Sequence, residues 1–193
     1  LQKNVSTGRR TAEAMAAAMA RLIVTADLSA AADADLVIEA AVEKVEIKKS
    51  IFAKLSDICA EDAILASNTS SISIVELASA VKNPNRFIGM HFFSPVPLMR
   101  LLEIVRSIAT DDETVAAVKA VGGKLGKTCI VSKDKPAFIV NRMLDPMLNE
   151  AIAILEAGTG SIEDIDTGMK CGLNHPMGPL ELLDMAGIDV ELA

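Results

Sequence analysis

The chain has 193 residues, of which 51% are apolar and 23% are charged, so it can bury a sizeable core and is not of the disordered class. Its net charge of −7 and its lack of Trp and Tyr argue against nucleic acid as a partner, because phosphate is repelled and no platform for base stacking exists. The longest apolar run, residues 14–20, falls far short of the roughly 20 residues that a membrane span needs. No membrane partner is therefore predicted.

The three cysteines lie far apart and form no C-x-x-C pair and no cluster with histidine. They are Cys59, Cys129 and Cys171. An odd, scattered set of this kind indicates reduced, mostly structural thiols in a cytoplasmic protein, and no metal site is predicted. The sequence shows no signal peptide, and it begins with Leu1 rather than Met, so we expect a piece of a longer protein.

Short apolar runs alternate with amphipathic segments over the first two thirds of the chain. Strands are predicted over residues 21–25, 35–40, 63–67, 87–93, 101–106 and 128–132. Helices are predicted over residues 1–20, 43–55, 71–81 and 111–125. The third of these helices carries a candidate capping box, Ser73 with Glu76. Continuous apolar strands separated by such helices are typical of an α/β fold, with a mostly parallel sheet covered on both faces.

The pattern changes after the last predicted strand. A long helix is expected over residues 137–156, entered at Pro136, and two further helices near residues 161–170 and 180–185. No strand is evident in this part, so an all-α segment follows the sheet, with a domain boundary near residues 133–135. The long helix carries more apolar side chains than the remaining chain can cover, which predicts a homo-oligomer built through residues beyond 136. These side chains are Phe138, Ile139, Met143, Met147, Leu148, Ile152 and Leu155.

Ligands of open α/β sheets bind beyond the carboxyl ends of the strands, so the polar residues found there are the candidates for a site. We expect them to meet in one crevice between the two parts of the chain. The candidates are Glu43, Lys48, Asn68, Ser70, His91, Ser94, Glu103 and Asn141.

A histidine and a carboxylate stand out among these candidates. Pro95 and Pro97 make a tight return after His91 plausible, and such a return brings Glu103 of the next strand beside the imidazole. A carboxylate that orients a histidine makes a general acid/base unit. A lone histidine at a strand end is also often a structural donor, and the polar residues 67–71 also suit a helix N-cap; these alternatives stay open.

Five segments resemble, in order and spacing, the L-3-hydroxyacyl-CoA dehydrogenase family, and within it the single-function bacterial 3-hydroxybutyryl-CoA dehydrogenase type. The segments are ADLVIEAAVEKVEIKKSIF, LASNTSSISI, RFIGMHFFSPVPLMRLLEIV, KDKPAFIVNRML and DIDTGMKCGLNHPMGPLELLD. The resemblance implies NAD as cofactor, an acyl-CoA thioester as substrate and oxidation of its 3-hydroxyl group to a ketone. It also implies a Rossmann-like NAD-binding domain over residues 1–134, incomplete at its N-terminus. An incomplete helical domain for dimerisation and substrate binding follows over residues 135–193.

The resemblance also implies roles for single residues. His91 matches the catalytic base, Glu103 the carboxylate paired with it, Ser70 the serine that binds the substrate hydroxyl near the nicotinamide, and Asn141 an asparagine that helps to hold the substrate. The residues that match the lining of the NAD site are Glu43, Lys48, Asn68, Ser70 and Ser94.

One motif of the family is not in the sequence. No G-x-G-x-x-G turn occurs, and the glycines of residues 122–126 lie at a predicted helix end, where glycine serves as a C-cap. The alternative is therefore a non-catalytic fragment that associates with CoA or forms oligomers. We expect residues 1–193 by themselves to bind NAD no more tightly than about millimolar and to turn over no substrate, because pyrophosphate is held mainly by that turn.

Overall fold

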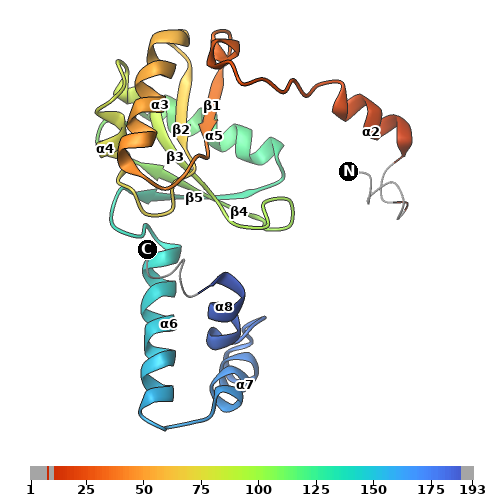
Figure 1. Ribbon diagram of the computed structural model, residues 1–193, viewed down its shortest axis with the longest axis vertical. Coiled ribbons are helices and arrows are strands. Elements are labelled where there is room, and N and C mark those ends of the chain that lie inside the picture. Colours follow the sequence, from red (N-terminus) through yellow and green to blue (C-terminus); the bar gives the residue numbers. More distant parts are fainter. Residues whose placement is uncertain (1–7, 9–10, 188–193) are drawn as a thin grey trace.

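The computed structural model describes Gly8 and residues 11–187, and its central feature is a five-stranded sheet (Figure 1). The strands lie in sequence order across the sheet. They are β1 (Leu36–Glu39), β2 (Ile64–Ser67), β3 (Phe87–Phe92), β4 (Leu101–Arg106) and β5 (Thr128–Lys133). The pairs β1–β2, β2–β3 and β4–β5 are parallel, and β3–β4 is antiparallel. The predicted mostly parallel, Rossmann-like α/β sheet is confirmed.

Helices cover both faces of the sheet, as the continuous apolar strands predict. Helices α3 (Val45–Ile58) and α4 (Ile74–Ala78) pack on one face, and α5 (Asp112–Lys124) packs on the other. Successive strand residues serve opposite faces: Leu65 belongs to the core under α3 and α4, and Ile64 and Ala66 belong to the core under α5. The core is thus split into two layers by the sheet.

Helix α4 lies close against β3 because Gly89 has no side chain. A Cβ atom at this position would lie 2.7 Å from the Cβ atom of Val105 and 2.9 Å from the Cδ1 atom of Ile74. Gly89 is the register partner of Val105 across the antiparallel pair. The absence of a side chain therefore fixes how α4, and the loop that precedes it, sit on the sheet.

Three helices follow the sheet: α6 (Val140–Glu156), α7 (Ile162–Leu173) and α8 (Pro179–Ala186). Figure 1 shows α6 running away from the sheet, with α7 and α8 beside it. Asp166 of α7 caps α8, because its carboxylate accepts the backbone N–H groups of Leu180 and Glu181. The all-α character of this part is as predicted, and the division into domains at residues 134 and 135 stays a prediction. No helix in the described part of the chain is long and apolar enough to cross a membrane.

The predicted strand over residues 21–25 is wrong. Leu22, Ile23 and Val24 form no ladder with any described residue, and Ile23 and Val24 are 90% and 97% exposed. A β-branched run becomes a strand only where a neighbouring strand pairs with it, and no strand of the described residues pairs with this one. The preceding helix α2 (Ala12–Met19) stands away from the sheet (Figure 1), inside the helix predicted over residues 1–20. Residues 1–7 and 9–10 of that prediction lie outside the described residues.

Two predicted helix starts also differ from the structure. The hydroxyl group of Ser73 makes no capping bond to its own helix and donates instead to Asp134, so the predicted capping box with Glu76 is wrong. Helix α6 begins at Val140 rather than at residue 137, because Ala137 and Phe138 adopt left-handed φ angles of 60° and 52°. The side chain of Phe138 is thereby buried in the core under α4 instead of lying on the helix.

The left-handed backbone of Ala137 gives a first prediction. The Ala137→Gly variant should raise the free energy of unfolding by up to about 1 kcal/mol. A Cβ atom in this conformation costs about 1–2 kcal/mol, and part of that gain is offset by the greater freedom of glycine in the unfolded chain. The matched Ala153→Gly variant inside α6 should lose about 1 kcal/mol instead. Urea unfolding followed by circular dichroism measures both, and equal losses in the two variants would contradict the argument.

Candidate active site

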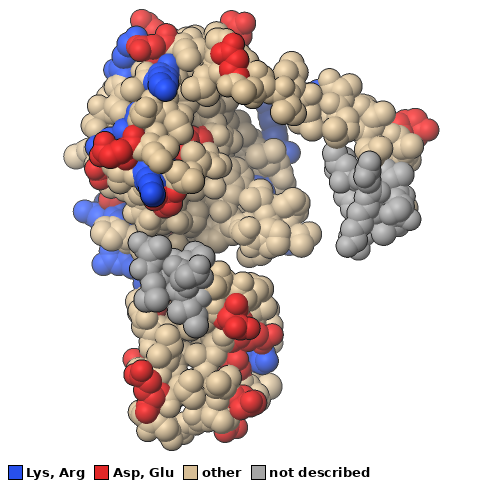
Figure 2. All heavy atoms as spheres, viewed as in Figure 1, with Lys and Arg blue, Asp and Glu red and all other residues tan. Residues whose placement is uncertain are grey.

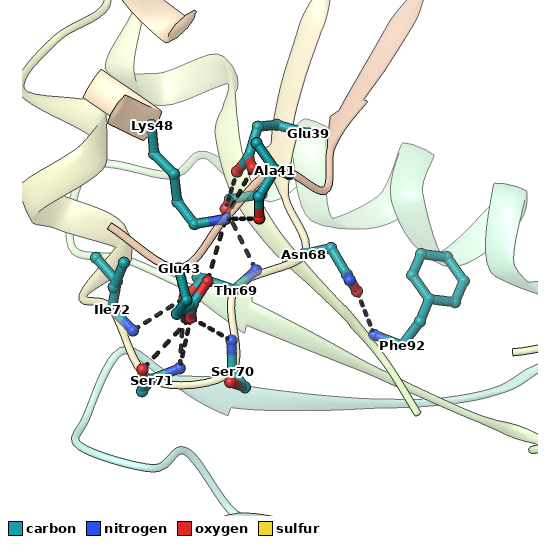
Figure 3. Close-up of polar contacts among 11 residues, drawn as sticks. Glu39, Ala41, Glu43, Lys48, Asn68, Thr69, Ser70, Ser71, Ile72 and Phe92 are labelled. Atoms are coloured by element: carbon teal, nitrogen blue, oxygen red, sulfur yellow. Dashed lines mark hydrogen bonds and ion pairs between the residues drawn. The ribbon is translucent and has the colours of Figure 1, made fainter. Parts of the chain in front are cut away.

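A buried lysine joins the carboxyl end of β1 to the start of α3 (Figure 3). Lys48 is 1% exposed, and its Nζ atom lies 2.7 Å from Oε1 of Glu39 and 3.1 Å from Oε2 of Glu43. It also donates to the carbonyl oxygen of Ala41 at 3.3 Å. Glu39 accepts the hydroxyl group of Ser67 at 2.7 Å, which ties β2 to the same cluster. The three donors of the ammonium group are thus used inside the protein, behind Glu43.

Glu43 gathers the polar loop that follows β2. Its Oε1 atom accepts the backbone N–H groups of Ser70 at 3.0 Å and Ser71 at 3.3 Å, together with the hydroxyl group of Thr69. Partial burial raises the pKa of Glu43, but the hydroxyl group of Thr69, the ammonium group of Lys48 and the N–H group of Ser70 outweigh it and hold the pKa below its ordinary value. The carboxylate therefore stays ionised and fixes the path of this loop.

Asn68 and Ser70, in the same loop, differ in how their side chains are bonded. The side-chain oxygen of Asn68 accepts the N–H group of Phe92 at 2.9 Å, which ties the loop to the end of β3 (Figure 3). Ser70 is half-buried, and its hydroxyl group makes no hydrogen bond with the described residues. The backbone of Ser70 is therefore fixed while its hydroxyl group is available to a ligand.

His91 and Glu103 form the predicted pair. They are register partners across β3 and β4, and Nδ1 of His91 lies 3.0 Å from Oε2 of Glu103. An ionised carboxylate only accepts hydrogen bonds, so the pairing places the proton of the neutral ring on Nδ1 and leaves Nε2 unprotonated. The other oxygen of Glu103 accepts the N–H group of Ile139 at 2.8 Å. The return after β3 thus produces the predicted geometry.

Two aromatic rings lie against the imidazole. The ring centroids of Phe93 and Phe138 are 4.4 Å and 5.8 Å from that of His91. Together with the bond to Glu103, these contacts fix the plane of the imidazole ring. A base held in one orientation has less freedom to lose when it meets a proton donor.

Ser94 and Asn141 are placed without hydrogen-bonded partners. Ser94 is exposed just after β3, and Asn141 lies in the first turn of α6, two residues beyond Ile139. Neither side chain bonds to another described residue. The structure thus joins two groups of predicted residues, around Glu43 and around His91, with Asn68 between them. The roles of all these residues stay predictions.

Sequence reasoning missed several residues that build the site. Glu39 has a signal that was available: it is an acid near the end of an almost wholly apolar strand, nine residues before Lys48. Phe138 and Asp134 have none, because the ring of Phe138 is placed by the left-handed turn that replaces the predicted start of the helix, and Asp134 bonds to a helix start 60 residues away in the sequence.

The lowered pKa of Glu43 gives a second prediction. A carboxylate with a depressed pKa in the folded protein adds stability above its unfolded pKa of about 4.3, and this stability is lost as the pH falls through the folded value. The Glu43→Gln variant should therefore be less stable than the natural protein at pH 7, and the difference should shrink below about pH 4.3. Urea unfolding across this range, with the exposed Glu46→Gln as control, measures it. A difference that is constant from pH 7 to pH 3 would contradict the assignment.

Known proteins similar to this chain cover its whole length. A curated 3-hydroxybutyryl-CoA dehydrogenase of Bradyrhizobium diazoefficiens is 53% identical over 193 residues, which are 100% of this chain and 66% of that protein. The enzyme of the same name from Clostridioides difficile is 45% identical, again over the whole chain and 69% of that protein. The crystal structure of (S)-3-hydroxybutyryl-CoA dehydrogenase from Ralstonia eutropha is 46% identical and superposes with a TM-score of 0.96, covering 99% of this chain and 68% of that one.

The chain spans about two thirds of the length of these relatives. Two family models match it in succession. The model described as "3-hydroxyacyl-CoA dehydrogenase, NAD binding domain" matches residues 1–135, and the model described as "3-hydroxyacyl-CoA dehydrogenase, C-terminal domain" matches residues 138–193. The matches agree with the mostly parallel sheet and the His91–Glu103 pair described above. The chain belongs to the 3-hydroxyacyl-CoA dehydrogenase family.

Proposed function

We propose that the protein containing residues 1–193 interconverts L-3-hydroxyacyl-CoA and 3-oxoacyl-CoA with NAD as cofactor. The observation that carries this proposal is the buried His91–Glu103 pair at the carboxyl end of β3, with Nε2 left for a substrate. The two relatives named 3-hydroxybutyryl-CoA dehydrogenase support the same reaction, and they favour it over a non-catalytic fragment.

In this proposal His91 is the general base and Glu103 stabilises its charged form. Nε2 takes the proton of the 3-hydroxyl group, C3 gives up its hydrogen as a hydride that bound NAD would accept, and the C3–O bond becomes a carbonyl. The ring then carries a positive charge beside a fully buried carboxylate, where an opposite charge 3.0 Å away is screened little. The reverse reaction returns the same proton to the oxygen.

Ser70 and Asn141 are proposed to hold the reacting oxygen. The backbone of Ser70 is fixed by Glu43, so its hydroxyl group can donate to the substrate oxygen without first ordering the loop. Asn141 lies in the first turn of α6, two residues after Ile139, which binds Glu103, so it belongs to the stretch of chain that joins the His91–Glu103 pair to the helical part. Each such neutral hydrogen bond contributes about 0.5–1.5 kcal/mol.

NAD is proposed to bind along the carboxyl ends of β1, β2 and β3, where the donor set suits a nicotinamide riboside. When bound, NAD accepts or supplies the hydride. Asn68, Ser70 and Ser94 offer amide and hydroxyl groups, and the partly exposed side chain of Glu43 offers a carboxylate. Because Lys48 is buried behind Glu43, we propose that it serves this site by holding Glu43 in place. The weak binding of NAD by residues 1–193 alone stays a prediction.

The proposal extends to partners and location. The acyl-CoA thioester is the small-molecule partner, and a second copy of the chain is proposed to dock on the helical part. Ile139, Met143 and Ile152 of this part are exposed, and Figure 2 shows wide uncharged areas between its acidic side chains. A cytoplasmic location is proposed from the three cysteines, all of which are free.

Removal of the Glu103 charge tests the mechanism. The Glu103→Gln variant should lower kcat by about 10²–10⁴-fold, the usual contribution of a general acid/base group. Glutamine keeps the shape and the acceptor for Ile139 but loses the counter-charge to the imidazolium. The assay follows NADH oxidation with acetoacetyl-CoA, and the exposed Glu113→Gln variant of α5 is the control. Near-normal turnover in Glu103→Gln would remove this carboxylate from the mechanism.

Association through the helical part makes another prediction. The protein should be a dimer or a larger oligomer in light scattering at micromolar concentration, because isolated apolar faces of this kind mark partner surfaces. The Met143→Glu variant, at a side chain that is 74% exposed, should weaken this association, whereas the same change at Val75 of α4 should not. A monomer at high micromolar concentration would count against the proposed interface.

A further inference from the structure

Asp134 holds a helix that begins 60 residues earlier in the sequence. It is the first residue after β5, and its own N–H group donates to the carbonyl oxygen of Arg106 at 3.0 Å, which continues the ladder between β4 and β5. Its carboxylate accepts three hydrogen bonds from the start of α4: the hydroxyl group of Ser73 at 2.9 Å and the N–H groups of Ile74 at 3.0 Å and Val75 at 2.8 Å. The cap of α4 is thus supplied by the connection to α6.

The loop that carries Ser70 depends on this cap. Its first half is held by Glu43, which accepts the N–H groups of Ser70 and Ser71. Its second half runs directly into α4, which has only five residues and no capping bond from its own Ser73. So short a helix does not fix its own first turn, because helix formation needs several turns to become favourable. Together with the bond from Ile72 to Thr69 and the close fit of α4 over Gly89, Asp134 therefore holds the far end of the loop.

The same connection also reaches the catalytic pair. Five residues after Asp134, the N–H group of Ile139 donates to Glu103, and the ring of Phe138 lies against His91. The chain between these two contacts passes through left-handed residues, so its course is tightly determined. One short segment, residues 134–139, is thus bonded at one end to the loop of Ser70 and at the other to the pair of His91 and Glu103.

We propose that Asp134 is a positioning residue of the dehydrogenase site, which sets the place of the Ser70 hydroxyl group relative to Nε2 of His91. The inference rests on the proposed function, since it assigns Ser70 and His91 to one substrate oxygen. Asp134 itself touches neither substrate nor cofactor. It acts through Ser73 and α4, and it makes the geometry of the site depend on the connection to the helical part.

The test compares Asp134 with a second aspartate that caps a helix elsewhere. Asp111 accepts the N–H group of Thr114 at 2.7 Å at the start of α5, a helix on the opposite face of the sheet. In the protein containing residues 1–193, Asp134→Ala should lower kcat for acetoacetyl-CoA about 10- to 100-fold, as expected when a reacting group shifts by a fraction of an ångström or more. Asp111→Ala should lose stability without this loss of kcat. Asp134→Asn, which keeps one acceptor oxygen, should restore part of the rate.

Amide hydrogen exchange supplies a reading that does not depend on turnover. In Asp134→Ala the N–H groups of Ser70 and Ser71 should exchange about tenfold faster or more, along with those of Ile74 and Val75. In Asp111→Ala only the start of α5 should change. Unchanged protection of Ser70 and Ser71, or a kcat equal to that of the natural protein, would overturn the proposal. If the natural protein shows no dehydrogenase activity, the proposed function fails and exchange alone decides whether Asp134 positions the loop.

Discussion

A carboxylate with no exposed surface is the constraint on which the rest of the site depends. Glu103 is 0% exposed, and an ionised group that is removed from water must find partners for both oxygens. One partner is the imidazole of His91 and the other is the backbone of Ile139. The β3–β4 return supplies the first and the turn before α6 supplies the second. A single buried charge therefore joins the antiparallel pair of the sheet to the helical part of the chain.

The same rule governs the cluster on β1 and α3. Two carboxylates, Glu39 and Glu43, share the single ammonium group of Lys48, so the cluster has a surplus negative charge. Further donors are the hydroxyl groups of Ser67, Thr69 and Ser71 and the N–H groups of Ala41, Ser70 and Ser71. Glu43 and Lys48, which the resemblance assigns to the lining of the NAD site, thus bond mainly to other residues of the protein. These bonds hold the loop of Ser70 in place and leave its hydroxyl group available.

The fold could be predicted from the sequence where local pattern and tertiary partner agree. The central strands β2, β3 and β4 are mostly apolar runs that are buried on both faces, and the His91–Glu103 pair follows from two prolines and a short return. Prediction from the sequence failed where the local structure depends on a residue or strand far away in the sequence. Residues 21–25 have strand propensity but pair with no strand in the described part of the chain, and the N–H groups at the start of α4 are capped by Asp134 rather than by Ser73. The left-handed turn at Ala137 could not be predicted, because the sequence has no glycine there to indicate a positive φ angle.

The outer edge of β1 bears on how copies of the chain associate. This strand pairs only with β2 among the described residues, and the backbone groups of its other edge, next to the partly exposed Ile38, bond to no described residue. When the edge of β1 pairs with the outer edge of β5 in another copy, the contact is head-to-tail and repeats without closing. A twofold contact through α6, by contrast, would close after two copies. The size distribution of the particles at rising concentration therefore tells which surface brings them together: a plateau indicates the helices, and continued growth indicates the sheet.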